Sequence, residues 1–144
     1  MARRILLVSL GSIGRRHLRN TQALLPEAEL CIWRHRPGDT PPEAEGIPVV
    51  YSQAEALAFA PDAVMVSSPA SFHAVQSAPF AAKGVPIFVE KPLEASADAL
   101  APLETALPNW STALWLKNTS GKKKPACWPR LTETTTSSTA MNTR

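Results

Sequence analysis

Short apolar runs alternate with longer segments of helical composition along residues 1–116. The clearest run covers residues 5–10 and ends at Gly11, and another has the sequence AVMVS at residues 63–67. Runs this short and this continuous are typical of strands that are buried on both faces, as in parallel sheets. The pattern predicts an α/β fold with a doubly wound parallel sheet. Its strands are expected near residues 4–9, 29–34, 48–51, 63–67, 85–89 and 112–116.

The segments between these runs predict four helices, at residues 13–25, 52–59, 71–83 and 96–107. In the first helix, which Pro26 stops, the spacing places several side chains on one face that should pack on the sheet. These are Ile13, His17 or Leu18, Thr21, and Leu24 or Leu25.

Residues with capping and breaking preferences mark the other helices. Ser52 and Ser71 are the expected N-caps of the second and third, and Gly84 is the expected C′ residue of the third. Because proline lacks the backbone N–H that a helix interior uses, Pro79 predicts a kink or short break in the third helix, and Pro102 interrupts the fourth.

The pattern stops after residue 116. Residues 117–144 contain a lysine run, two prolines and seven threonines, without periodicity. Such a segment buries too little apolar surface to offset its ordering entropy, so we expect it to be disordered. We therefore divide the chain into one domain at residues 1–116 and a low-complexity tail at residues 117–144, whose abrupt composition suggests a foreign reading frame or a truncated gene.

The positive charge of the chain lies in the tail. Residues 1–116 contain nine Lys or Arg and eleven Asp or Glu, whereas residues 117–144 contain six and one. The net charge is therefore −2 on the body and +5 on the tail, so the basic pI says little about the partners of the body. Nucleic-acid binding through the tail is the least favoured alternative, because it would be purely electrostatic.

The N-terminus has some features of an export signal, since Arg3 and Arg4 precede the apolar run. No small-residue cleavage site follows, and Arg15 and Arg16 stand where one would be expected. We therefore interpret residues 5–17 as a strand, a glycine turn and the start of a helix. No apolar run is long enough to cross a membrane, and two distant cysteines suit a reducing compartment, so the sequence predicts a cytoplasmic protein.

The glycine turn is a candidate phosphate site. A strand followed by such a turn leaves backbone N–H groups pointing outward at the start of a helix, where the helix dipole also attracts anions. In the fingerprint G-x-G-x-x-G the second glycine admits a pyrophosphate and the third allows close helix–strand packing. Here the first place holds a serine, a departure expected to strain the tight turn or to shift the phosphate slightly, and the alternative is an ordinary β–α turn. The candidate cofactor-binding residues are Ser9, Gly11, Ser12, Ile13 and Gly14.

The expected second strand ends in arginines. An NAD-binding domain places a carboxylate on the ribose about 20 residues past the fingerprint, but this chain has Arg34, His35 and Arg36 there. Guanidinium groups can hold a 2′-phosphate by charge-assisted hydrogen bonds. NADP(H) is thus favoured over NAD(H), and the alternative is a pair of solvated arginines at a strand end.

Two further strand ends carry polar residues, and ligands of open α/β sheets bind beyond the carboxyl ends of the strands. A lysine there can orient a substrate hydroxyl or stabilise an oxyanion. The alternative for Lys91 is a surface lysine paired with Glu90, and for His73 a helix-start residue that the backbone satisfies. The further candidate residues are Ser67, Ser68, Pro69, His73, Glu90 and Lys91.

Three segments together resemble one protein family. VSLGSIGRRHLRN, SSPASFHA and VPIFVEKPLEAS, in that order, are similar to the N-terminal domain of the Gfo/Idh/MocA oxidoreductases, which include glucose–fructose oxidoreductase and inositol dehydrogenase. The resemblance covers roughly residues 3–116. It implies a Rossmann domain that binds NAD(P), with Lys91 as a catalytic residue near the nicotinamide and Pro69 and His73 lining the cofactor cleft.

In complete relatives the resemblance implies hydride transfer between the nicotinamide and a sugar or polyol. It also implies a second domain that binds substrate and supplies an Asp/His pair, which residues 117–144 do not resemble. The alternative function is a non-catalytic nucleotide-binding or interaction module.

Overall fold

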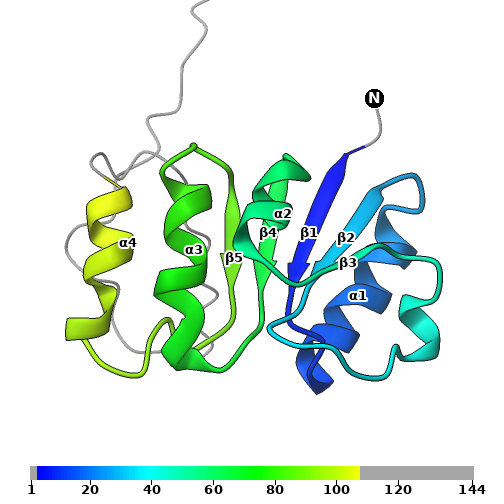
Figure 1. Ribbon diagram of the computed structural model, residues 1–144, viewed down its shortest axis with the longest axis horizontal. Helices are drawn as coiled ribbons and strands as arrows, with labels where there is room; N and C mark the ends of the chain where they lie inside the picture. Colours follow the sequence, from blue (N-terminus) through cyan, green and yellow to red (C-terminus); the bar gives the residue numbers. More distant parts are fainter. Residues whose placement is uncertain (1–2, 108–144) are drawn as a thin grey trace, which may run out of the picture.

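Five parallel strands form one sheet in the computed structural model, which describes residues 3–107. The strand order is β3-β2-β1-β4-β5 (Figure 1). The predicted strands are confirmed over slightly shorter ranges, and the one expected at residues 112–116 lies outside the described residues, as does the predicted tail. The bounds are β1 Arg4–Val8, β2 Glu29–Trp33, β3 Val49–Val50, β4 Ala63–Val66 and β5 Ile87–Val89.

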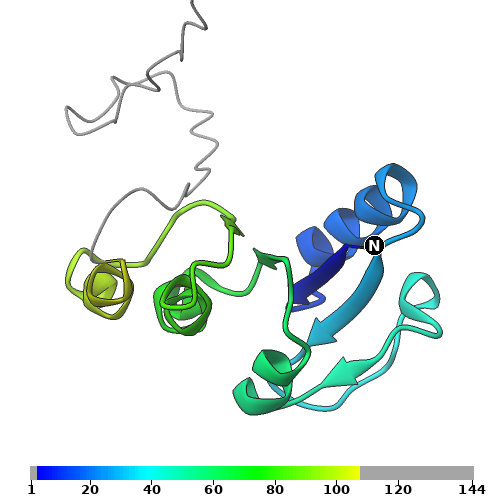
Figure 2. The ribbon, with the colours of Figure 1, turned by 90° about the horizontal axis from the view of Figure 1, so that it is seen from above.

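Helices cover both faces of the sheet, which confirms the doubly wound α/β fold. Figure 2 shows α1 and α2 on opposite sides of the strands. α3 lies on the same face as α2, and α4 packs against α3. The helices are α1 Ser12–Leu24, α2 Gln53–Ala58, α3 His73–Ala81 and α4 Ala101–Ala106, with 3-10 turns η1 Pro42–Ala44, η2 Ala70–Phe72 and η3 Asp98–Leu100.

The central strand β1 shows why its sequence is continuously apolar. Successive side chains of a strand point to opposite faces. Ile5 and Leu7 pack in the cluster that contains Leu18 of α1. Leu6 and Val8 pack in the cluster on the other face, with α2, α3 and α4. Both faces are covered, so no position along the strand favours a polar residue.

The apolar face of α1 ends sooner than the sequence predicts. Leu18 and Thr21 are buried as expected, but Leu24 is 78% exposed and Leu25 is 42% exposed. Leu24 and Leu25 therefore do not belong to the face of α1 that packs on the sheet.

The start of α3 also differs from the prediction. Ser71 is not an N-cap, because residues 70–72 form the 3-10 turn η2 after Pro69 and α3 begins at His73. Pro79 lies inside α3. Gly84 has a φ of +72°, as expected for a residue that ends a helix, although it lies beyond the expected C′ position, since the C-cap is Ala82.

The predicted helix at residues 96–107 is divided in two. η3 precedes α4, and Pro102 lies in the first turn of α4. A proline in the first turn loses no hydrogen bond, since its N–H would have had no partner within the helix. Pro102 therefore starts a helix where the sequence analysis expected it to interrupt one.

The predicted cap at Ser52 is confirmed. Its side chain accepts a hydrogen bond from the Glu55 amide, and the Glu55 carboxylate accepts one from the Ser52 amide. This reciprocal capping satisfies two donors at the start of α2. Among residues 3–107, none of the helices combines the length and the apolarity that crossing a membrane requires.

Candidate functional site

All five strands end at the same level. Val8 of β1 pairs with both Trp33 of β2 and Val66 of β4. Trp33 in turn pairs with Val50, and Val66 pairs with Val89. Because the strands are parallel, the segments that follow them all leave from one edge of the sheet (Figure 1).

This edge brings the candidate residues of the sequence analysis together. These residues follow the ends of four strands. Open α/β sheets bind their ligands at this edge. Ser9, Gly11, Ser12, Ile13 and Gly14 follow β1, Arg34, His35 and Arg36 follow β2, Ser67, Ser68, Pro69 and His73 follow β4, and Glu90 and Lys91 follow β5.

The turn after β1 leads directly into α1. The Ser9 amide donates to the carbonyl of Trp33, and the Arg15 amide donates to the carbonyl of Gly11, the N-cap of α1. No side chain caps this helix and no acidic residue stands in its first turn. The amides of Ser12 and Ile13 have no acceptor among residues 3–107. The start of α1 is therefore suited to bind an anion.

The two glycines of this turn meet different surroundings. A Cβ at Gly11 would have no atom within 4 Å. A Cβ at Gly14 would lie 2.5 Å from the carbonyl oxygen of Ser9 and 2.8 Å from Oγ of Ser67. Gly14 is thus required for the close approach of α1 to the ends of β1 and β4, whereas Gly11 faces open space.

Ser9 occupies the first glycine position of the fingerprint in a left-handed conformation, with φ +78°. A residue with a Cβ loses roughly 1–2 kcal/mol in this region, while glycine loses up to about 1 kcal/mol of unfolded-state entropy. We therefore expect Ser9→Gly to raise the free energy of unfolding by up to about 1 kcal/mol. Chemical denaturation measures this change, and nucleotide titration should show slightly tighter binding as the turn relaxes.

Two substitutions control this prediction. Ser9→Ala keeps the Cβ and should give no stabilisation. Ala60 also has a positive φ, of 50°, and it precedes β4, away from the edge where the strands end. Ala60→Gly should therefore stabilise the fold without changing nucleotide affinity. A loss of stability in Ser9→Gly would refute the strain argument.

Arg34 holds the loop that follows β2. Its Nη1 donates to the carbonyls of Gly38 and Asp39, at 2.9 and 3.0 Å. Nε and Nη2 have no hydrogen-bond acceptor among residues 3–107, and the exposed side chain of Arg36 has neither a hydrogen bond nor an ion pair with those residues. The His35 ring stacks on Phe72 at 6.1 Å between centroids.

Glu43 clamps the loop onto α1. Its carboxylate accepts hydrogen bonds from Nε and Nη2 of Arg15, at 2.6 and 3.2 Å, and from Nη1 of Arg19, at 3.0 Å. Its backbone carbonyl accepts one from the side chain of Gln22. The hydrogen bond from Arg15 is the main cause that lowers the pKa of Glu43 from its ordinary value near 4.5 to about 2. This contact joins the segment after β2 to α1, the helix that follows the glycine turn.

The clamp should make stability depend on acid pH. A carboxyl whose pKa is lowered by folding stabilises the fold above its unfolded pKa, and this contribution is lost as the pH falls through the folded pKa. We expect the melting temperature of the parent to exceed that of Glu43→Gln at pH 6, and this difference to shrink between pH 4.5 and about 2. Thermal unfolding at a series of pH values measures it. A difference that stays constant over this range would contradict the role of the ionised carboxylate.

The loop after β4 is attached to β1 and to α3. Oγ of Ser67 donates to the carbonyl of Val8 at 3.1 Å, and Oγ of Ser68 donates to Oε1 of Gln76 at 2.5 Å. Pro69 is exposed beside them. The serines thus fix the path of the loop and leave Pro69 at the surface.

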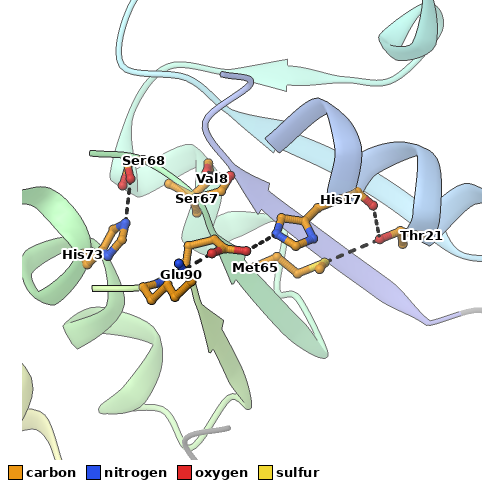
Figure 3. Close-up of polar contacts among 9 residues, drawn as sticks. Val8, His17, Thr21, Met65, Ser67, Ser68, His73 and Glu90 are labelled. Carbon is orange, nitrogen blue, oxygen red and sulfur yellow. Dashed lines mark hydrogen bonds and ion pairs between the residues drawn. The ribbon is translucent and has the colours of Figure 1, made fainter. Parts of the chain in front are cut away.

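His73 joins the loops that follow β4 and β5. Its Nε2 lies 2.6 Å from the carbonyl oxygen of Ser68, as Figure 3 shows, and its Nδ1 lies 2.9 Å from that of Pro92. A carbonyl only accepts, so a singly protonated ring donates to one of them and an imidazolium to both. The residue is 1% exposed. This geometry matches the alternative of a helix-start histidine satisfied by the backbone, so His73 joins the two loops from within the fold.

The carboxylate of Glu90 contacts a side chain of α1 and not the side chain of the neighbouring lysine. Its Oε1 lies 2.6 Å from Nε2 of His17 (Figure 3), and its Oε2 accepts from the Lys91 amide at 3.3 Å. The ammonium of Lys91 is exposed and forms no ion pair within residues 3–107. The alternative of a Lys91–Glu90 ion pair is therefore wrong for this structure.

The sequence did not indicate the contacts that His17, Glu43 and Phe72 make with the candidate residues and with α1. The spacing assigned His17 only to the buried face of the first helix, and Glu43 lies in η1, between the predicted strands, where no element was predicted. Each contacts a residue far along the chain, and no local spacing indicates such a partner. The position of His17, one turn beyond Gly14, was the only signal available.

A protein-family model described as an oxidoreductase family with an NAD-binding Rossmann fold matches residues 3–114. The chain has no significant match among curated proteins. Among solved structures it is similar to the WlbA dehydrogenase from Bordetella pertussis in complex with NADH and UDP-GlcNAcA, at 26% identity and a TM-score of 0.59, over 75% of this chain and 34% of that one.

Two further solved structures are similar at comparable levels. A family member from Vibrio cholerae is 26% identical over 74% of this chain and 35% of its own, with a TM-score of 0.62. GenD2 from gentamicin A biosynthesis, in complex with NAD, is 27% identical over 73% of this chain and 31% of its own, with a TM-score of 0.61. The chain thus spans about a third of the length of the structures that it matches.

Proposed function

The chain belongs to the Gfo/Idh/MocA oxidoreductase family and forms its NAD-binding Rossmann domain, and from this premise we propose how its residues hold the cofactor. The pyrophosphate of a nicotinamide dinucleotide binds at the start of α1, against the open side of Gly11. The observation that carries this proposal is the unobstructed space at Gly11 beside amides without acceptors. Membership favours an oxidoreductase over the alternative of a non-catalytic module.

We propose that the loop after β2 selects NADP(H) over NAD(H). Arg34 keeps Nε and Nη2 for a ligand while Nη1 holds the loop. Arg36 stands exposed beside it, and no carboxylate precedes Asp39 in this loop to hold a ribose hydroxyl. Two guanidinium groups favour a 2′-phosphate by charge and by hydrogen bonding.

We propose that Lys91 orients a substrate hydroxyl. Lys91 is exposed at the carboxyl edge of the sheet, two residues past the end of β5, where its ammonium can donate to a sugar or polyol oxygen. The nicotinamide, when bound, gives or accepts the hydride. Lys91 contributes by holding the hydroxyl and stabilising negative charge on its oxygen. The sugar nucleotide UDP-GlcNAcA, which is bound together with NADH in the similar WlbA dehydrogenase, supports a sugar-type substrate.

A cytoplasmic location is part of the proposal. Cys31 is a free, buried thiol in the core of the sheet, and burial raises the pKa of this thiol. Reducing compartments keep cysteine residues as free thiols, which supports this location.

Calorimetric titration of the full chain with NADPH, NADH and a DNA duplex tests the function. We expect saturable binding of NADPH, weaker binding of NADH and no saturable binding of the duplex. If neither nucleotide binds, the proposed site is wrong. If only the duplex binds, with a steep dependence on salt, the chain acts through its basic segment instead.

A further inference from the structure

The carboxylate of Glu90 has a partner on each oxygen. Nε2 of His17 lies 2.6 Å from Oε1, and the Lys91 amide lies 3.3 Å from Oε2. An ionised carboxylate only accepts hydrogen bonds, so the nitrogen of His17 that faces it carries a proton. The side chains of His17 and Glu90 are 15% and 22% exposed, which screens their contact from water more than a surface pair.

The His17 ring is itself held in place. It packs edge-on against Phe88 of β5, at 5.2 Å between ring centroids. Its backbone carbonyl accepts a hydrogen bond from the hydroxyl of Thr21. The amide of Glu90 donates to the carbonyl of Val66, which continues the pairing of β5 with β4. His17 and Glu90 are thus fixed from two rigid elements that face each other (Figure 3).

Lys91 is the cation nearest to Glu90 along the chain, yet it does not pair with it. If the Glu90 carboxylate had no other partner, the flexible side chain of Lys91 could bring its ammonium to that carboxylate and form an ion pair. Here the carboxylate is turned towards α1, and the ammonium forms no ion pair within residues 3–107.

We propose that His17 is a positioning residue that binds Glu90 and thereby keeps the ammonium of Lys91 unpaired. The inference rests on the proposed function, because an unpaired ammonium is what a lysine that orients a substrate hydroxyl requires. A residue of α1 would thus control the pairing of Lys91. His17 has this effect through Glu90, without contacting the lysine side chain.

Trace acetylation of the full chain with acetic anhydride tests the proposal. The reagent attacks unprotonated amines, so a lysine that gains a carboxylate partner reacts more slowly. Mass mapping of peptides gives the labelling of Lys91 relative to Lys83, an exposed lysine after α3 that serves as an internal control. We expect His17→Ala to lower this ratio about two- to fivefold, as an exposed lysine–carboxylate pair allows.

Two further variants separate pairing from general disturbance. The double variant His17→Ala with Glu90→Gln should restore the parental ratio, because no carboxylate is left to capture Lys91. His17→Gln, whose amide can still donate to Glu90, should stay near the parent. An unchanged ratio in His17→Ala, or a fall that persists in the double variant, would overturn the proposal.

If His17→Ala does not fold, Glu90→Gln alone decides. The ratio should then rise by less than about twofold, because the carboxylate is not paired with Lys91 in the parent. A larger rise of the labelling ratio would show that Glu90 is paired with Lys91 in the parent, and it would overturn the proposal. Labelling in the presence of NADPH tests the proposed function separately, since bound cofactor should protect Lys91 whether or not His17 controls its pairing.

Discussion

Gly11→Val should weaken NADPH binding by at least about 100-fold, or about 2.8 kcal/mol, while the fold stays intact. The side chain would enter the open space beside the first amides of α1, where the pyrophosphate is proposed to lie. Apart from its two neighbours in the chain, no described residue has an atom within 4 Å of the added Cβ, and the φ of −63° suits any residue. Calorimetry with NADPH, paired with thermal unfolding, measures both effects.

Gly14→Ala is the matched control for this substitution. Its Cβ would stand 2.5 Å from the Ser9 carbonyl oxygen, so backbone must move, and overpacking of this kind costs about 1–3 kcal/mol of stability. Gly11→Val should thus lose ligand without losing stability, and Gly14→Ala should lose stability first. Parental affinity in Gly11→Val would place the pyrophosphate elsewhere and remove the main support for the proposed site.

NADPH should bind at least about tenfold more tightly than NADH. Replacing Arg34 and Arg36 together by alanine should remove most of this preference. Charge-assisted hydrogen bonds to a 2′-phosphate contribute roughly 1.5–3 kcal/mol, which NADH cannot use. Affinities for both nucleotides, measured at one salt concentration, test this. Equal affinities in the unmodified protein would refute the selection of NADP(H).

Single variants separate charge from loop structure. Arg36→Ala removes a guanidinium without a protein partner among residues 3–107, so it should affect NADPH alone. Arg34→Ala also removes the hydrogen bonds to the carbonyls of Gly38 and Asp39, so it should slightly weaken the binding of NADH as well. Arg16→Ala, which removes an exposed charge from α1, should leave the ratio of the two affinities unchanged if local contacts decide it.

The sequence predicted the sheet well, because buried parallel strands leave a local signal. In β1, β2 and β4 the residues that cross the core are continuously apolar, and a polar residue (Ser9, Arg34 or Ser67) follows the end of each strand. The helix boundaries were harder to predict. Ser71 and Pro102 have local preferences that fit several positions in a turn, and the path of the preceding loop decides between them.

The candidate site was predicted as a set of strand ends, but not as a network. His17 with Glu90, and Arg15 with Glu43, are separated by long stretches of chain. Such pairs depend on how a helix is placed over the sheet, which periodicity does not specify. His73 shows the converse, since its place in the sequence was noted but its burial between two carbonyls follows only from the fold.

The clamp at Glu43 has a consequence for exchanging parts between relatives. The loop after β2, which carries Arg34 and Arg36, is anchored by partners that belong to a different segment of the chain, Arg15 and Arg19 of α1. A loop that is transferred alone into a relative would therefore lose the contacts of Glu43 with Arg15 and Arg19. If the loop selects the cofactor as proposed, the smallest unit that transfers this choice between proteins is discontinuous, and consists of the loop together with the face of α1 that carries Arg15 and Arg19.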